Sequence, residues 1–307
     1  MSDGGVIQPG STLGVLGGGQ LGRMFAQAAQ RLGYRVHVYT TPGDAVASHV
    51  ADETTVGAYE DLDLLTTFAS RVDAITVEFE NVPASSMAHV ESHRPVRPSS
   101  SVLGVAQNRV REKSTLASHG LPVTPFHPVR TSDDLDEARR ALGPDLVVKT
   151  SSSGYDGKGQ QRVGASDETA DVWARLACDD LIAEQMIEFD REISVVGARG
   201  ASGEIALFDP IENEHRRHIL HRSVSPTSMA AHVEHDALEI ARGVLEALDV
   251  VGVLCVEFFV TPDGMLLINE IAPRPHNSGH LTIEAFETSQ FEQQVRALCG
   301  LPLGSTA

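Results

Sequence analysis

A glycine-rich stretch that follows a predicted strand carries the strongest chemical signal in the sequence. The strand ends at Lys149, and a run of seven residues follows shortly after it: Gly154, Tyr155, Asp156, Gly157, Lys158, Gly159 and Gln160. Glycine loses much backbone entropy on folding, so this hairpin tip fits a loop whose N–H groups lie over a ligand. Lys149 and Lys158 add positive charge suited to a polyphosphate. A mobile surface hairpin is the alternative, and the run is not a Walker A loop because no Gly-Lys-Ser/Thr opens a helix.

A second signal comes from two glutamates in a predicted hairpin, Glu257 and Glu270. If Asp-Gly at 263–264 forms a two-residue turn, the two carboxylates lie directly opposite each other on one face of the sheet. Like charges in that position destabilise the pair unless a cation bridges them. Mg²⁺ prefers oxygen ligands and also binds substrate phosphates, so the pattern predicts a magnesium site. A slip of one residue in the pairing would remove the argument.

Polar residues also follow predicted strands elsewhere. Arg274, His276 and Asn277 belong to the proline-stiffened segment 272–280, directly after the strand that carries Glu270. Their place favours contact with a metal-bound phosphate, and an ordinary loop is the alternative. Glu78 ends another predicted strand, where parallel sheets bind ligands, although a solvated strand end explains it equally well.

Three glycines, Gly17, Gly19 and Gly22, lie between a strand and a helix with the spacing of a dinucleotide-binding turn. Such a turn lets backbone amides approach a phosphate at the helix N-terminus. A dinucleotide site also needs an acidic residue at the end of the second strand, but the strand end after Tyr39 has none, and Asp44 lies beyond a turn. The pattern therefore favours a tight turn or an anion site over an NAD-dependent oxidoreductase.

The elements that position these residues change in character along the chain. Strand patterns at 12–16, 36–39 and 74–77 alternate with helix patterns at 21–32 and 61–69, which predicts a parallel sheet with helices on its faces. Residues 94–98 are the best domain boundary, and the serines after them can cap a helix that runs to about Ser118. The second half predicts α+β structure with hairpins, with strands at 146–149, 181–185, 191–198, 203–208, 252–260 and 265–271 and helices at 167–177 and 234–248.

Composition excludes several classes of protein. The chain has 307 residues and a formal net charge of −18, which disfavours general binding to nucleic acid or anionic membranes. Its 3 cysteines are far apart and unpaired in pattern, which fits a reducing compartment better than a disulfide framework. Neither a secretory signal nor a membrane-spanning run is visible. We therefore expect a soluble, cytoplasmic protein of about two domains.

The motifs together, from GGGQLGRM through GYDGKGQ and EQMIEFDREIS to VEFFVTPDG and NEIAPRPHNSGH, resemble the ATP-grasp superfamily. They are most similar to its 5-(carboxyamino)imidazole ribonucleotide synthases, and the resemblance extends from Gly14 to Leu303. It implies an ATP-grasp fold of α/β and α+β character with an N-terminal Rossmann-like pre-ATP-grasp domain at 1–98. The ATP-grasp domain would occupy 99–298, with a lid subdomain at about 122–187. Residues 299–307 would begin a C-terminal domain that is otherwise missing.

The resemblance also implies substrates, cofactors and site residues. It implies ATP with Mg²⁺, the small-molecule substrates aminoimidazole ribonucleotide and bicarbonate, and a homodimer. The ATP-binding residues would be Arg109, Lys149, residues 154–160, Glu184, Gln185, Met186, Ile187, Glu192, His215, Asn269 and Glu270. Glu257 and Glu270 would bind the metal. Arg274 and His276 would lie beside bicarbonate, and these two with Lys149 would be the catalytic residues. Gln20, Glu78, Tyr155 and Asn277 would contact the imidazole nucleotide.

Two other functions are compatible with parts of this pattern. Within the same superfamily, a formate-dependent glycinamide ribonucleotide enzyme is the runner-up, and the segment 272–280 favours the bicarbonate user over it. Many ATP-grasp enzymes carry Glu-x-Asn on the metal strand, whereas here Ala272 occupies the position of that asparagine, two residues after Glu270. The synthase branch resembles this sequence at that position, which supports the narrower assignment. A nucleotide-binding module that is inactive without its C-terminal domain is the third hypothesis.

Overall fold

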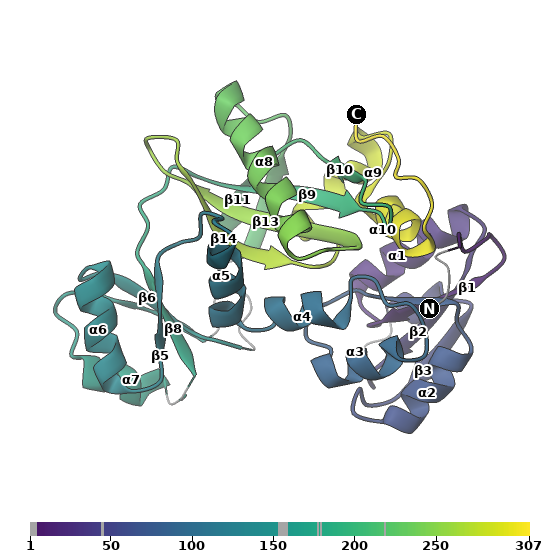
Figure 1. Ribbon diagram of the computed structural model, residues 1–307, viewed down its shortest axis with the longest axis horizontal. Coiled ribbons are helices and arrows are strands. Elements are labelled where there is room, and N and C mark those ends of the chain that lie inside the picture. Colours follow the sequence, from purple (N-terminus) through teal and green to yellow (C-terminus); the bar gives the residue numbers. More distant parts are fainter. Residues whose placement is uncertain (1–4, 44–45, 153–158, 177, 179, 218) are drawn as a thin grey trace.

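The computed structural model describes the whole chain except residues 1–4, 44–45, 153–158, 177, 179 and 218. Its elements form three groups arranged along the longest axis, each built on a separate sheet (Figure 1). The parallel sheet of the first third of the chain lies at one end, the small sheet with α6 and α7 lies at the other, and the largest sheet lies between them. This is the mixture of α/β and α+β architecture that the sequence predicts.

The N-terminal sheet has four parallel strands in the order β3-β2-β1-β4. Its strands are β1 (Thr12–Leu16), β2 (Arg35–Thr40), β3 (Glu53–Val56) and β4 (Ala74–Val77). One face packs against α2 (Leu62–Ser70) and α3 (Ala84–Glu91), and the other against α1 (Gln20–Arg31). The predicted parallel sheet is confirmed, while β3 and α3 were missed because both are short and weakly patterned.

The single helix predicted from the serines to about Ser118 is wrong, because two helices occupy this region. They are α4 (Ser100–Ala106) and α5 (Arg109–Ser118). Between them, Gln107 Nε2 donates to the carbonyl oxygens of Glu80 and Val82, and Asn108 accepts a hydrogen bond from Arg111 N at 2.9 Å. Asn108 is therefore the N-cap of a new helix, whose start brings Arg109 to the strand end at Thr150.

A second sheet, which we call the lid sheet because it lies in the lid subdomain predicted at about 122–187, is antiparallel, in the order β5-β8-β6-β7. Its strands are β5 (Phe126–Val129), β6 (Leu146–Thr150), β7 (Gln160–Val163) and β8 (Leu181–Gln185). Lys149 pairs with Gln160, so β6 and β7 form the hairpin predicted around the glycine-rich run. Residues of α6 (Ser132–Leu142) and α7 (Thr169–Leu176) complete a hydrophobic core of the lid's own.

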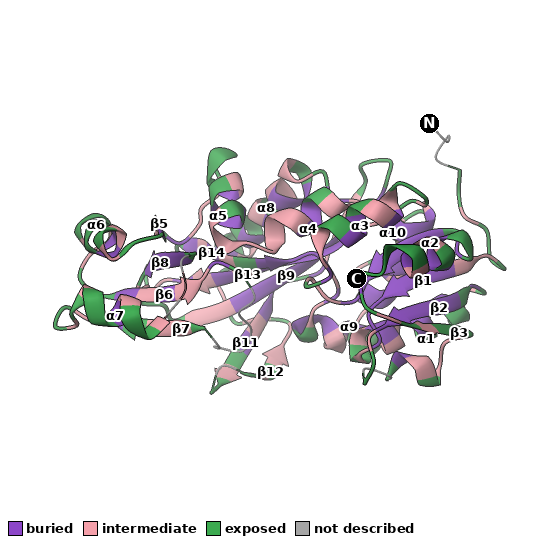
Figure 2. Ribbon diagram, turned by 90° about the horizontal axis from the view of Figure 1, so that it is seen from below, coloured by how far each residue is buried: buried purple, intermediate pink, exposed green. Residues whose placement is uncertain are grey.

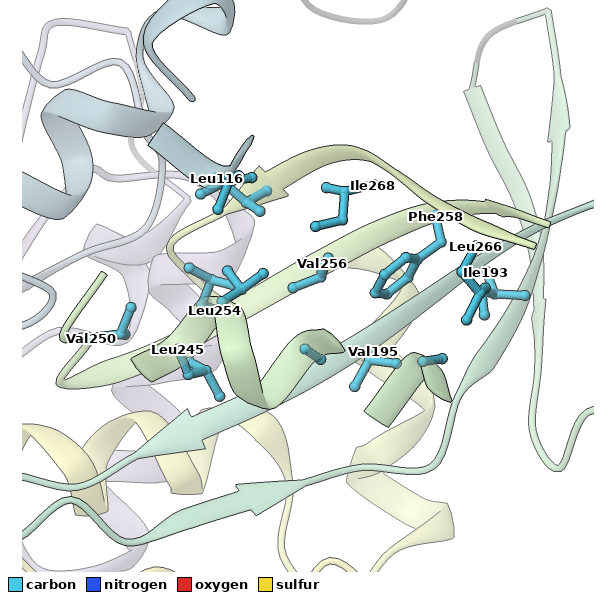
Figure 3. Packing of buried hydrophobic residues seen from close by; sticks show 14 of the residues in the cluster. Leu116, Ile193, Val195, Leu245, Val250, Leu254, Val256, Phe258, Leu266 and Ile268 are labelled. Carbon is cyan, nitrogen blue, oxygen red and sulfur yellow. The ribbon is translucent and has the colours of Figure 1, made fainter. Parts of the chain in front are cut away.

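The central sheet is antiparallel, with the order β12-β11-β9-β13-β14 and with β10 paired to β9. Its strands are β9 (Arg191–Arg199), β10 (Ile205–Leu207), β11 (Ile211–Arg216), β12 (Ile219–Val224), β13 (Gly252–Val260) and β14 (Leu266–Ala272). The helix α8 (Ala231–Ala247) covers one face, where Leu245 packs with Leu254 and Val256 among other buried side chains (Figure 3). Strands β9 and β13 are buried along most of their length (Figure 2).

The remaining elements connect the central sheet to the N-terminal domain. They are the turn η2 (Asn277–Leu281), the short helix α9 (Thr282–Ala285) and α10 (Gln290–Cys299). Val295 and Leu298 of α10 belong to the same hydrophobic core as Phe25 of α1. The α10 helix therefore packs against the N-terminal domain, from which it lies far apart in the sequence. Among the described residues, no helix combines the length and apolar character needed to cross a membrane.

Candidate active site

Strands β13 and β14 place Glu257 directly opposite Glu270, as the sequence predicts. The turn assumed in that prediction is wrong, because Val260 pairs with Leu266, one residue away from a two-residue Asp-Gly hairpin. The pairing shifts by one residue between Glu257 and Phe258, which makes Asn269 the extra residue of a β-bulge. This bulge restores the opposition of the two carboxylates and turns Asn269 toward the same cleft.

The two carboxylates differ in their surroundings. Glu257 lies 2.8 Å from His276 Nε2, and although burial opposes its charge, His276 holds the pKa of Glu257 below its usual value. Desolvation and the charge of Glu257 both raise the pKa of Glu270. The two facing carboxylates repel each other when both are ionised, so Glu270 resists ionisation. A divalent cation between them would stabilise the ionised form of both.

This set of donors fits Mg²⁺ completed by a substrate phosphate. Among the residues that the structure describes, no group of three or more His, Cys, Asp or Glu side chains could hold a metal ion alone. Mg²⁺ is usually held by one or two carboxylates together with water and substrate phosphates. Glu257, Glu270 and the neighbouring amide of Asn269 supply oxygen ligands of that kind.

A buried charge cluster lies beside the metal strand. Lys149 Nζ is 2.8 Å from Glu184 Oε2, and Lys113 Nζ is 3.6 Å from Glu184 Oε1. Burial opposes ionisation of Glu184, but Lys113 and Lys149 keep its pKa below the usual value. Glu184 is only 3% exposed, so the two lysines, not water, keep this carboxylate charged. It lies at the junction of the lid and the central sheet.

Lys113 is the part of this cluster that sequence reasoning missed. Its side chain is fully buried, and Nζ donates to Thr124 Oγ1 at 2.5 Å and to the carbonyl oxygen of Asn269 at 2.8 Å. One ammonium group thus contacts the entry to the lid, the bulge of the metal strand and Glu184. Its neighbour Glu112 is also buried, and desolvation raises the pKa of that carboxyl well above its usual value. A short helix without clear periodicity gave no signal for either residue.

The opposite end of the cleft joins two domains. Arg274 makes a bidentate ion pair with Glu80, through Nε to Oε2 and through Nη2 to Oε1 at 3.1 Å. Burial opposes ionisation of Glu80, but Arg274 keeps its pKa below the usual value. His276 Nδ1 is 2.8 Å from Ser278 Oγ. The N-terminal domain therefore contributes an acid that orients Arg274.

A further wall of the cleft comes from β9, β11 and β12. His215 Nδ1 is 2.9 Å from Glu192 Oε2, and this hydrogen bond raises the pKa of His215. This wall also carries three exposed basic side chains that no sequence motif indicated, Arg217 between β11 and β12 and His221 and Arg222 on β12. Neither β11 nor β12 was predicted, because their polar sequence resembles a loop.

One cleft with a volume of about 990 Å³ brings most of the predicted residues together. Its lining includes Arg109, Lys149, Gln160, Glu184, Gln185, Met186, Ile187, Glu192, His215, Glu257, Asn269, Glu270, Arg274, His276 and Asn277. Gly159 precedes β7 and does not line the cleft. The predicted loop residues Gly154, Tyr155, Asp156, Gly157 and Lys158 lie outside the described residues.

The glycine turn and two predicted substrate residues lie outside this cleft. Glu78 accepts hydrogen bonds from Gly19 N at 2.5 Å and Gly22 N at 2.6 Å, so the anion at the N-terminus of α1 is a carboxylate of the same chain. A Cβ on Gly17 would lie 2.1 Å from Glu78 Cγ, which explains the glycine there. Glu78 therefore stabilises the glycine turn, and its predicted contact with the imidazole nucleotide stays a prediction. Gln20 is exposed at the start of α1 and does not line the cleft.

Comparisons with known proteins agree with this geometry. The profile of the ATP-grasp domain matches residues 114–291, and that of the ribonucleotide synthetase preATP-grasp domain matches residues 11–107. The N5-carboxyaminoimidazole ribonucleotide synthase of Brucella melitensis is 44% identical over 302 residues, which are 98% of this chain and 83% of that protein. A bifunctional purine synthesis protein of Dictyostelium discoideum is 40% identical over 98% of this chain, which spans only 31% of that longer protein.

Two solved structures extend the comparison. An N5-carboxyaminoimidazole ribonucleotide synthetase in complex with ADP superimposes with a TM-score of 0.95 at 40% identity, covering 100% of this chain and 81% of that one. A synthase of Aspergillus clavatus in complex with ADP and 5-aminoimidazole ribonucleotide gives a TM-score of 0.88 at 29% identity, covering 96% and 78% of the two chains.

Proposed function

Because this chain belongs to the ATP-grasp superfamily and, within it, to the N5-carboxyaminoimidazole ribonucleotide synthases, we propose that it uses ATP and bicarbonate to carboxylate the exocyclic amine of 5-aminoimidazole ribonucleotide. In this reaction a bicarbonate oxygen attacks the γ-phosphorus of ATP and ADP leaves. The carboxyphosphate so formed releases phosphate and delivers its carbon as CO₂ to the amine, which loses a proton. The product is the 5-carboxyamino nucleotide of purine biosynthesis.

The observation that carries this proposal is the order of charges along one cleft. Cationic groups at Arg109 and Lys149 lie on the lid side, and the facing carboxylates of Glu257 and Glu270 lie on the central sheet. Arg274 lies at the end that adjoins the N-terminal domain. This order of charges suits a nucleotide whose polyphosphate lies between the basic side chains and a cation held by the two carboxylates. A small anion would bind beyond it, at Arg274.

At the nucleotide end, we assign the base and ribose to the wall around β8 and β9. Glu184 Oε1 accepts no hydrogen bond within the described part of the chain and can accept one from the amino group of the base. Residues 185–187 follow it along the same wall, and Glu192 with His215 lies where the ribose would be held. Lys149, already held by Glu184, then directs its ammonium group toward the phosphates.

Glu257, Glu270 and Asn269 are the residues that would hold Mg²⁺, which neutralises developing charge on the transferred phosphoryl group when bound. Arg274, fixed by two hydrogen bonds to Glu80, presents its guanidinium to the bicarbonate end, where His276 also lies. We assign the imidazole nucleotide to the same end, where Asn277 lines the cleft. A homodimeric assembly and a cytoplasmic location are part of this proposal, supported by the family alone.

The test is release of phosphate from ATP with Mg²⁺ and bicarbonate, measured with and without 5-aminoimidazole ribonucleotide. We expect the nucleotide to stimulate release. Glu257→Gln should lower kcat by about 100-fold or more, since even groups that only support metal ligands typically contribute 10- to 100-fold. Glu239→Gln, at an exposed acid of α8, is the control and should match the wild type. Absence of ATP binding would refute the proposal, and ATP binding without phosphate release would favour a nucleotide-binding module.

A further inference from the structure

Three glutamines of α10 are buried and reach separate segments of the chain. Gln290 and Gln293 are 0% exposed, and Gln294 is 2% exposed. Gln294 Nε2 donates to Thr76 Oγ1 and to the carbonyl oxygen of Val77, both at 3.0 Å. A buried amide without partners is costly, so each of these side chains must have a definite place in the fold.

Gln290 holds the backbone of His276 from both sides. Its Oε1 accepts a hydrogen bond from His276 N at 2.9 Å, and its Nε2 donates to the carbonyl oxygen of His276 at 2.7 Å. Gln290 is itself anchored, because its backbone N donates to Thr282 Oγ1 at 3.0 Å. A Cβ on Gly279 would lie 2.5 Å from Gln290 Oε1, so this glycine leaves room for the amide.

The imidazole of His276 is held as firmly as its backbone. Nδ1 lies 2.8 Å from Ser278 Oγ, and Nε2 lies 2.8 Å from Glu257 Oε1. All four polar atoms of His276 therefore have a partner. Two of these partners come from one side chain that does not line the cleft.

We propose that Gln290 is a positioning residue for the reaction, because its amide fixes the backbone of His276 and so sets the place of the imidazole beside Glu257. The inference rests on the proposed function and adds to it a residue outside the cleft. Two hydrogen bonds to the backbone N–H and C=O of one residue restrict both its position and its orientation. If they are lost, His276 can move without any change in the residues that contact ATP.

The chain contains a matched control three residues along the same helix. Gln293 makes the same pair of bonds to another backbone, donating from Nε2 to the carbonyl oxygen of Gly304 at 2.7 Å and accepting from Gly304 N at 3.0 Å. The two glutamines therefore share the same helix, the same degree of burial and the same bonding pattern. Only Gln290 bonds a residue that lines the cleft, His276. A purely structural role predicts equal effects of the two substitutions.

The experiment compares Gln290→Met, Gln290→Glu and Gln293→Met in the full chain. In Gln290→Met we expect kcat for bicarbonate-dependent ATP cleavage to fall roughly 10- to 100-fold, while KM for ATP stays within about twofold. Gln290→Glu can still accept from His276 N but cannot donate to its carbonyl oxygen, so an intermediate kcat is expected. Gln293→Met should keep the wild-type kcat even if its melting temperature falls by a similar amount.

Hydrogen–deuterium exchange of the peptide containing His276 supplies a readout that does not depend on activity. Exchange there should accelerate in Gln290→Met and remain at the wild-type rate in Gln293→Met. Unchanged exchange in Gln290→Met, or an equal loss of kcat in both methionine variants, would overturn the inference. If the wild type does not cleave ATP, the proposed function fails, and the exchange result alone decides whether Gln290 holds His276.

Discussion

Replacing Glu78 by glutamine tests whether the glycine turn is built around an internal anion. Both carboxylate oxygens of Glu78 accept from backbone amides, Gly19 N at 2.5 Å and Gly22 N at 2.6 Å. A glutamine keeps the shape of the side chain and one acceptor oxygen. Its NH₂ group would face the second amide, so two donors would meet in a position that is 7% exposed.

The expected cost follows from these contacts. A hydrogen bond to a charged group contributes about 1.5–3 kcal/mol, and a buried donor left without a partner costs about 1–3 kcal/mol. Loss of the negative charge at the N-terminus of α1 adds about 0.3–1 kcal/mol. Allowing for overlap between these contributions, we expect Glu78→Gln to lower the free energy of unfolding by about 3–5 kcal/mol.

The assay is urea unfolding followed by far-ultraviolet circular dichroism, with Asp61→Asn as the matched control. Asp61 caps α2 by accepting one hydrogen bond, from Leu64 N at 2.9 Å, and is exposed. Asparagine caps helices as well as aspartate, so this change should cost less than about 1 kcal/mol. If Glu78→Gln costs no more than Asp61→Asn, the turn does not depend on the anion and the reasoning is wrong.

Two further predictions concern buried charges. Lys113→Met should lower the free energy of unfolding by about 3–5 kcal/mol, because Glu184 would lose one of two cationic partners in the interior; a change below about 1 kcal/mol in thermal or urea unfolding would contradict it. Burial lowers the pKa of His37, outweighing the opposing charge of Glu53, so the unfolded state takes up a proton first as pH falls. Stability should therefore decrease as pH drops below about 6.5, the ordinary histidine pKa, and this decrease should be weaker in His37→Gln. Equal pH dependence of wild type and variant would show that His37 is not responsible.

The candidate site was predictable from sequence where chemistry and spacing point to the same residues. Glu257 and Glu270 were paired from the hairpin alone, yet the assumed turn was wrong and the bulge at Asn269 corrected it. Nothing in the sequence marks that bulge, because it depends on contacts such as the one from Lys113 to the carbonyl oxygen of Asn269. The predicted pairing is therefore correct because the one-residue difference at the turn is cancelled by the one-residue shift at the bulge.

Other parts of the structure depend on contacts between distant segments. The break before α5 exists because Gln107 donates to carbonyl oxygens of 80 and 82, which no local pattern records. Glu80 lies just beyond β4, and its pairing with Arg274 joins residues 194 positions apart. Long-range hydrogen bonds of this kind decide the function of a side chain whose own neighbourhood carries no signal.

Because the lid has a hydrophobic core of its own, we expect this part of the chain to unfold as an independent unit. Its buried residues all lie between Val129 and Ala183, and Phe126 pairs with Glu184, so the segment enters and leaves the body side by side. The free energy needed to unfold such a unit locally can be lower than the free energy needed to unfold the whole molecule. The sequence contains 1 tryptophan, Trp173, which packs against this core. Its fluorescence is therefore an intrinsic optical reporter of the lid alone, against a body that contributes no tryptophan signal.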